Sequence, residues 1–336
     1  MSAVTRRSLP EKGVVLTPAD EVPGLVSTVI TCYNKAPYLA EAIESALMQD
    51  YTPHEVVVVD DGSTDESPAV AQSFGTRIRL IRQANAGASA AKNRGIREAR
   101  GEFVAFLDGD DRWLPGKLSK QMPLFARNPR VSVVYADRVK FSGTDTRIPE
   151  PERRHLRFHR GRVLDQILLD DFVSFSTAVV RRASLLEVGL LNENQRISDD
   201  YDLWLRVARC YEFDYVDEVL VEYRAATGGL SESGAENLLH HVLEIQERFA
   251  QTYFGGRYPN RAVWRRSLAG KYAAHAARHL VAGRHRKAIG SYLRAIWSDP
   301  SYLPPYYYIF RSMVPHRVVD HIKSRALGRP SSGALS

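Results

Sequence analysis

Three carboxylates fall within four positions in the run Asp108-Gly109-Asp110-Asp111, directly after the apolar segment Phe103–Leu107. Like charges this close repel one another and raise one another's pKa unless a cation compensates them. Carboxylate oxygens suit Mg²⁺ or Mn²⁺, and such an ion usually completes its shell with water and the phosphates of a substrate. The run therefore predicts a metal and phosphate site. A turn that leads into a helix at Leu114-Pro115 is the alternative that these residue types leave open.

A second acidic pair, Asp60-Asp61, follows the apolar segment Glu55–Val59 in the same way. The carboxyl ends of parallel strands meet at one edge of a sheet, so the two acidic turns are expected to face one cleft. Two such turns favour a nucleotide and metal site over unrelated turns. The chain has no Walker phosphate loop and no Gly-x-Gly-x-x-Gly sequence, so phosphate charge must be met by a metal and by basic side chains.

Two further groups of polar residues could complete such a site. Lys92 and Arg94 open a predicted helix after Gly87 and are candidates for phosphate contacts, although cations on a helix surface are commonly only solvated. Asp199 and Asp200 open another predicted helix, where a carboxylate is favoured by the helix dipole alone. If a carboxylate there faces the cleft, it can take a proton from an alcohol as a general base.

The hydrophobic pattern predicts the elements that position these residues. Extended segments at 25–31, 55–60, 78–81 and 103–107 alternate with helices at 37–49, after 65, and at 90–100. Near-continuous apolar strands between helices indicate an α/β fold, a doubly wound, mostly parallel sheet flanked by helices. Further on we expect helices at 117–127, 183–188 and from 199, extended segments at 131–136 and 172–180, and a loop or hairpin over 137–162 that shapes a pocket for the second substrate.

The basic charge is concentrated in the C-terminal part. Of the net charge of +7, residues 257–329 contribute +13, from 15 Lys and Arg against 2 Asp, and the rest of the chain contributes −6. Nucleic acid, an anionic membrane surface or a phosphate-bearing acceptor would each explain this charge. No recognised nucleic-acid reading module accompanies it, so nucleic acid is not expected as a partner. Helical patterns at 238–249, 264–281 and 287–296 predict a helical extension.

We therefore expect four parts: a flexible lead-in at 1–24, an α/β domain at 25–234, a basic helical extension at 235–328 and a disordered tail at 329–336. Two cysteines without metal spacing, Cys32 and Cys210, favour a reducing compartment such as the cytoplasm. No secretory signal and no apolar stretch long enough for a membrane span are visible, so we expect a soluble or membrane-peripheral protein.

Residues 26 to about 231 resemble the family 2 glycosyltransferases with the GT-A fold. The segments that carry the resemblance are, in chain order, Val26–Asn34, Val59–Asp65, Gly87 with Asn93–Ile96, Leu107–Asp111, Asp199–Arg206, and Glu222–Arg224 with Ser231. The resemblance implies an inverting transfer of a sugar from a nucleoside diphosphate sugar to an acceptor hydroxyl. Uridine is the base that the resemblance favours, with guanosine and thymidine open.

The resemblance also assigns roles to residues. Thr31 and Asp61 would line the base and ribose pocket, and Lys92, where the family commonly has Arg, would touch the nucleotide. Asp108, Asp110 and Asp111 would form the metal and ribose site, with Asp110 and Asp111 nearest a Mg²⁺ or Mn²⁺ ion. Asp200 would be the general base, preceded by Asp199 where the family often has Glu. Arg224 and Ser231 would belong to a mobile loop over the diphosphate, with Gly228-Gly229 as its hinge.

These observations together predict a metal-dependent glycosyltransferase with a glycan or lipid-linked acceptor. It would act in the synthesis of cell-surface polysaccharide or glycolipid, in the cytoplasm or at the inner face of the membrane. A non-catalytic subunit that binds nucleotide sugars is one alternative, but it should lack the base or the acidic run, and both are present. A nucleotidyltransferase is another, but Tyr33–Pro37 is not the Gly-rich loop that its triphosphate needs.

Overall fold

The computed structural model of the chain describes residues 21–142, 146–148, 158–195, 197–225 and 238–313. The chain divides into two compact units, a sheet unit made of Met1–Ile167 with Asp171–Ala235 and a helical unit made of Leu168–Asp170 with Glu236–Ser336. The residues expected as the lead-in up to 20, and those expected as the tail, lie outside the described residues. The strand expected at 25–31 begins earlier, at Val22.

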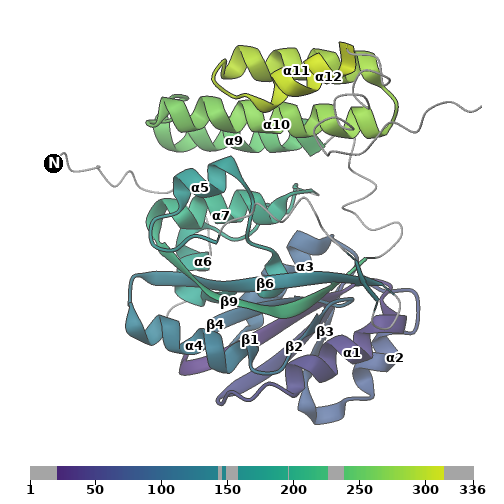
Figure 1. Cartoon of the computed structure of the whole chain (residues 1–336). Coiled ribbons are helices and arrows are strands. Elements are labelled where there is room, and N and C mark those ends of the chain that lie inside the picture. Colours follow the sequence, from purple (N-terminus) through teal and green to yellow (C-terminus); the bar gives the residue numbers. More distant parts are fainter. Residues whose placement is uncertain (1–20, 143–145, 149–157, 196, 226–237, 314–336) are drawn as a thin grey trace, which may run out of the picture. The chain divides into compact units, whose positions relative to one another are not determined.

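One sheet of nine strands forms the centre of the sheet unit (Figure 1). Four strands lie parallel in the order β3-β2-β1-β4, as the alternating pattern predicted. They span Val22–Cys32 (β1), His54–Asp60 (β2), Arg79–Arg82 (β3) and Gly101–Asp108 (β4). Their buried apolar side chains explain why helices cover both faces of this half of the sheet.

The other half of the sheet is mixed, in the order β8-β6-β9-β5 beyond β4, with β7 paired to β6. These strands span Arg112–Trp113 (β5), Val131–Ser142 (β6), Thr146–Ile148 (β7), Val179–Arg181 (β8) and Glu212–Arg224 (β9). The segment from 137 does contain a hairpin, β6–β7, but the expectation that the strand ends at 136 is wrong. Residues 137–141 continue β6 because they pair in parallel with β9.

Helices pack on both faces of the sheet, and the pleat of β1 decides which side chains they meet. Val26 and Ile30 belong to the core cluster that also holds Leu39 of α1 and Phe125 of α4. Val29 points to the other face, where α3 approaches so closely that a Cβ at Gly95 would lie 2.2 Å from Val29 Cγ1. The helices are α1 (Ala36–Leu47), α2 (Ser67–Gln72), α3 (Ala88–Glu98), α4 (Lys117–Arg127), α6 (Arg182–Val188) and α7 (Asp199–Cys210).

The segment expected to be extended over 172–180 is extended only in part. A short 3₁₀ turn, Phe175–Thr177, interrupts it before β8. The turn brings Ser176 next to the end of β4, where Asp108 N donates to Ser176 Oγ at 3.2 Å. The sequence pattern did not predict this contact.

The described part of the helical unit contains four helices after a piece of α5 (Leu164–Leu169). They are α9 (Leu238–Phe254), α10 (Arg261–Val281), α11 (His285–Ser298) and α12 (Pro304–Met313), which confirms the predicted C-terminal helices. Small buried alanines such as Ala276 and Ala288 let α10 and α11 pack closely around Tyr292. Among the helices that the structure describes, none has the length and apolar character that crossing a membrane requires.

Candidate active site

The two acidic turns lie at the same edge of the parallel sheet. Asp60 pairs in register with Cys32 at the end of β1, and Asp108 pairs with Thr31 on the other side of the same strand. Gly109 N donates to the Thr31 carbonyl oxygen at 2.9 Å, which holds the second turn against β1. The register of β1 thus brings together carboxylates that are almost 50 positions apart in the sequence.

Asp61 is buried and holds the segment before α3. Its Oδ1 accepts from Gln83 Nε2 at 2.7 Å and from Ala86 N at 2.9 Å, and its Oδ2 accepts from Gly87 N at 2.8 Å. The carboxylate therefore fixes the start of α3, the helix that carries Lys92. Its assignment to a base and ribose pocket, together with that of Thr31, stays a prediction.

Asp110 forms an ion pair with Lys35, which lies in the turn after β1. Burial disfavours the ammonium form of Lys35, but the charge of Asp110, helped by Asp108 and Asp111, outweighs burial and raises the pKa of this lysine. No motif around Lys35 predicts a role for it in the sequence. Its position in the chain could have indicated this contact, because a cation just beyond the end of β1 must lie beside the acidic turns that follow β2 and β4.

Asp111 differs from Asp108 and Asp110 because its side chain is buried. Its Oδ2 accepts from Ser176 Oγ at 2.6 Å, and its Oδ1 accepts from Arg224 N at 2.9 Å. Burial first, and then the charges of Asp108 and Asp110, raise the pKa of Asp111 well above its ordinary value, and these two hydrogen bonds oppose that rise. Asp111 thus joins the end of β4 to the end of β9.

Arg224 is the last residue of β9, so its expected place in a mobile loop is wrong for the described residues. The side chain is buried: Nε donates to the Asp110 carbonyl oxygen at 2.9 Å, and Nη2 donates to Glu41 Oε2 at 2.6 Å. Its guanidinium also lies 4.4 Å from the centroid of the Tyr38 ring. Gly228, Gly229 and Ser231 lie outside the described residues.

Lys92 connects the acidic edge with the start of α7. Its buried Nζ lies 3.6 Å from Asp108 Oδ1 and 3.9 Å from Asp199 Oδ2, and 4.6 Å from the centroid of the Phe175 ring. Burial disfavours the charged form, but Asp108, Asp199 and Asp200 outweigh it and raise the pKa of Lys92. Ser89, one turn earlier on α3, donates through Oγ to Asp199 Oδ2 at 3.0 Å. The start of α7 is thereby held at the site.

Asp200 is the second residue of α7, and its Oδ1 accepts from the Tyr201 backbone N at 2.9 Å. Burial first, and then the charge of Asp199, raise the pKa of Asp200 to about 7, although that hydrogen bond and the charge of Lys92 act in the opposite direction. A carboxyl group with this pKa is partly ionised near neutral pH. Such a group is suited to general-base chemistry.

The residues at this edge fit a divalent cation by the chemistry of their donors. Asp108 and Asp110 offer carboxylate oxygens, with 36% and 16% of their side chains exposed, and one or two carboxylates suffice for Mg²⁺ when phosphates and water complete the shell. Within the described ranges, no group of three or more His, Cys, Asp or Glu residues is arranged to hold an ion by itself. A cation held by Asp108 and Asp110 would complete its shell with water or with oxygens of a substrate, and Lys35 forms an ion pair with the same Asp110 carboxylate.

Comparisons with known proteins agree with this geometry. Residues 27–189 match the family model described as "Glycosyl transferase family 2". An uncharacterized glycosyltransferase of Rickettsia felis is 31% identical over 222 residues, which cover 65% of this chain and 36% of the relative. TuaG of Bacillus subtilis, named for teichuronic acid biosynthesis, is 28% identical over 213 residues, which cover 62% of this chain and 81% of TuaG. The chain spans from about a third to just under two thirds of the length of the first curated relatives that it matches.

Two solved structures share the fold. TarS 1–349 of S. aureus in complex with UDP-GlcNAc has a TM-score of 0.53 at 17% identity, covering 82% of this chain and 92% of that chain. Mannosyltransferase PcManGT of Pyrobaculum calidifontis in complex with GDP-Man and Mn²⁺ has a TM-score of 0.52 at 20% identity, covering 82% and 87%. Residues 27–189 therefore match glycosyl transferase family 2, a family of transferase enzymes, and the chain shares the GT-A fold of these two solved structures.

Proposed function

We propose that the protein is a metal-dependent, inverting glycosyltransferase that moves a sugar from a nucleoside diphosphate sugar to an acceptor hydroxyl. One observation supports this most: Lys92 lies within ion-pair distance of both Asp108 at the end of β4 and Asp199 at the start of α7. Because Asp200 directly follows Asp199 in the chain, this buried cation relates the candidate general base to the candidate phosphate site.

The reaction needs groups with distinct tasks. Asp200 accepts the proton of the acceptor hydroxyl as its oxygen bonds to the anomeric carbon, while the bond from that carbon to the diphosphate oxygen breaks. The electron pair of that bond leaves with the nucleoside diphosphate. Lys92 and Lys35 stabilise the negative charge that grows on the diphosphate. Direct displacement inverts the anomeric carbon because attack and departure occur on opposite faces.

A divalent cation, when bound, would supply further stabilisation of the departing diphosphate. Asp108 and Asp110 are the residues that would hold it, because their carboxylates are the more exposed ones of the acidic run. Asp111 supports the site through its hydrogen bonds with Ser176 and Arg224, and its expected place next to the ion stays a prediction. The donor nucleotide is proposed to be uridine-based, because the resemblance favours uridine.

Calorimetric titration tests the donor site. We expect one of UDP, GDP and dTDP to bind the wild-type chain more tightly with Mn²⁺ than without it. The substitution Asp110→Asn should weaken the Mn²⁺-dependent binding about tenfold or more, because it removes a charged oxygen ligand. Asp217→Asn, at an exposed position of β9, is the matched control and should bind as the wild type does. Equal affinities for wild type and Asp110→Asn, or no binding of any nucleotide, would contradict the proposal.

The acceptor is proposed to be a glycan or lipid-linked molecule of cell-surface polysaccharide or glycolipid synthesis, reached at an anionic membrane surface. The basic helical unit supports this, and its Trp297 side chain is 87% exposed. Sedimentation with vesicles measures it: more protein should sediment with anionic than with neutral vesicles at low salt, and the difference should fall at high salt. Absence of any preference for anionic vesicles at low salt would remove the membrane from the proposal.

A further inference from the structure

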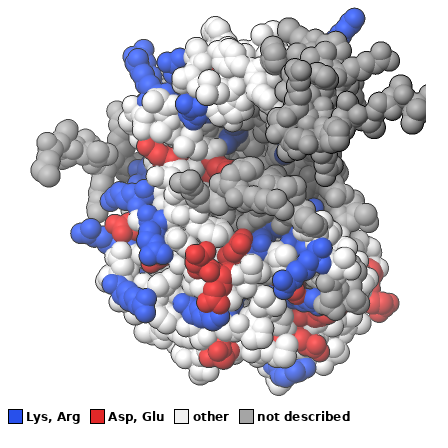
Figure 2. All heavy atoms as spheres, viewed as in Figure 1, with Lys and Arg blue, Asp and Glu red and all other residues white. Residues whose placement is uncertain are grey.

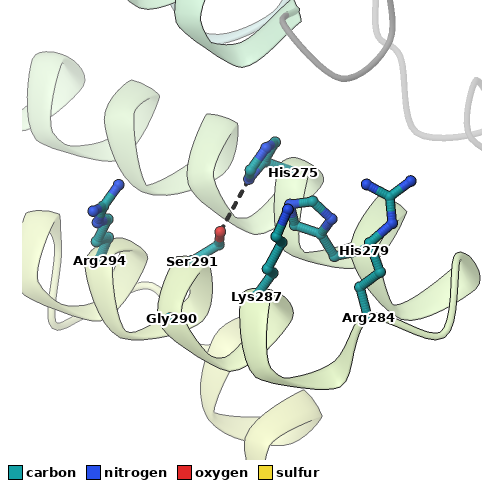
Figure 3. A pocket seen from close by; sticks show the side chains of 7 residues that line it. All are labelled: His275, His279, Arg284, Lys287, Gly290, Ser291 and Arg294. Atoms are coloured by element: carbon teal, nitrogen blue, oxygen red, sulfur yellow. Dashed lines mark hydrogen bonds between the residues drawn. The ribbon is translucent and has the colours of Figure 1, made fainter.

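Lysines and arginines of this chain lie in two kinds of surroundings. Many are exposed: they are spread over the face shown in Figure 2, and exposed basic side chains of α11 line a groove of the helical unit (Figure 3). Two lysines differ from these, because each lies against a carboxylate of the acidic run. Lys92 pairs with Asp108, and Lys35 pairs with Asp110. Each of the two carboxylates proposed to hold a divalent cation therefore already has a lysine partner.

The two lysines are held differently. The Lys92 side chain is 8% exposed, and its Nζ also approaches Asp199 and the Phe175 ring. The Lys35 side chain is 29% exposed, and within the described ranges its ion pair is with Asp110. An ammonium is a strongly hydrated point charge on a flexible stem, so a partly exposed one can exchange a carboxylate for water or for another anion. Lys35 is therefore the more easily displaced of the two.

The backbone is fixed on both sides of the ion pair between Lys35 and Asp110. Lys35 N donates to Ser67 Oγ at the start of α2, at 2.8 Å. The carbonyl oxygen of Asp110 accepts from Arg224 Nε at 2.9 Å. Because these bonds do not involve the paired ammonium and carboxylate, the Lys35 side chain can leave Asp110 while the fold around it stays in place.

An ammonium and a divalent cation on the same carboxylate repel each other. At a separation of about 4 Å, a single and a double positive charge repel strongly enough to change a binding constant about tenfold or more. Lys35 at Asp110 therefore disfavours a cation there. The diphosphate of a donor nucleotide offers the ammonium another anionic partner, and charge-assisted hydrogen bonds to phosphate oxygens are strong.

We propose that Lys35 is an exchangeable counter-charge, which neutralises Asp110 in the absence of the donor and moves to the diphosphate when the donor and a divalent cation bind. This proposal rests on the proposed function, because it needs the cation at Asp108 and Asp110. Its consequence is thermodynamic coupling: the nucleotide raises the affinity of the site for the cation, and the cation raises the affinity for the nucleotide by the same factor. Part of that factor depends on Lys35.

The first test measures Mn²⁺ binding to the full-length chain without nucleotide, through the electron paramagnetic resonance signal of unbound Mn²⁺. Lys35→Met should lower the dissociation constant for Mn²⁺ about tenfold, because the competing charge is removed. Lys35→Arg keeps the charge and should bind Mn²⁺ as the wild type does. Arg82→Met is the matched control: Arg82 pairs with Asp60 of the other acidic turn at 3.1 Å, so the variant removes an equal charge from a different carboxylate. Its affinity for Mn²⁺ should change little.

The second test repeats the Mn²⁺ titration with saturating UDP, or with GDP or dTDP where calorimetry identifies one of these. The nucleotide should lower the dissociation constant for Mn²⁺ by a larger factor in the wild type than in Lys35→Met, because only the wild type has the lysine to move.

The outcomes separate this proposal from the proposed function. If Lys35→Met binds Mn²⁺ no more tightly than the wild type or than Arg82→Met, the exchange of Lys35 is wrong even where the nucleotide binds. If Lys35→Met binds Mn²⁺ more tightly but no nucleotide binds any of the proteins, Lys35 competes with the cation and the proposed transfer activity is wrong.

Discussion

Replacing Asp200 by asparagine is expected to lower the turnover number by about 100- to 10,000-fold, the usual contribution of a positioned general base. Asparagine keeps the shape of the side chain and its acceptor oxygen for Tyr201 N, so the start of α7 should remain intact. The dissociation constant of the donor nucleotide should change little. The measurement is the steady-state rate of sugar transfer or, with water as the acceptor, of nucleotide sugar hydrolysis, using the donor identified by calorimetry.

The pH dependence of the wild type supplies a second readout for the same residue. Only the ionised carboxylate accepts a proton, and the pKa of Asp200 is raised to about 7. Below that pH, kcat/KM should rise about tenfold for each pH unit, and above it the rise should level off. Asp217→Asn serves as the matched control and should keep both the rate and the profile. An Asp200→Asn variant with the wild-type rate would exclude Asp200 as the base.

Replacing Lys117 by methionine is expected to raise the free energy of unfolding near neutral pH by about 1–4 kcal/mol, the range found when buried ion pairs are replaced by apolar residues of similar volume. Lys117 is the first residue of α4 and has no exposed surface. Its Nζ has no hydrogen-bond partner among the described residues and lies 4.0 Å from the centroid of the Trp113 ring. Methionine fills nearly the same volume without a charge to desolvate.

The sign of the pH effect follows from proton linkage. Burial lowers the pKa of Lys117 in the folded chain well below its ordinary value. At every pH between the lowered pKa and the ordinary pKa, the unfolded chain therefore binds a proton on this lysine that the folded chain does not. The free energy of unfolding of the wild type therefore gains about 1.4 kcal/mol per pH unit from this group across that interval. The advantage of Lys117→Met should accordingly be largest near neutral pH and shrink as the pH rises towards about 10.

Denaturant unfolding of the two proteins over a pH series measures this effect. Lys120→Met is the matched control, because Lys120 lies on the same helix with 40% of its side chain exposed and pairs with Glu218 at the surface. Its effect should stay within about 0.5 kcal/mol and show no such pH trend. A Lys117→Met protein that is less stable than the wild type at every pH would show that packing of the lysine stem outweighs the cost of burying its amine.

The amino-acid pattern is sufficient to predict the parallel half of the sheet and the position of its acidic turns. The strands there are continuous apolar runs, and apolar residues recur with the helical period of 3.6 in the segments between them. Each acidic turn directly follows a strand. Local pattern suffices in such a case, because parallel strands joined by right-handed crossovers must end at one edge. The resemblance then related the dispersed acidic segments to one family, although the roles that it assigns to Thr31, Asp61 and Asp200 stay predictions.

The groups that contact the acidic edge could not be predicted from local sequence, because they come together only in the folded chain. Lys35 reaches Asp110, Ser176 reaches Asp111, and Arg224 is part of a strand and not of a loop. None of these contacts has a local signature, since each joins residues more than 60 positions apart whose side chains would look like ordinary polar surface in the sequence.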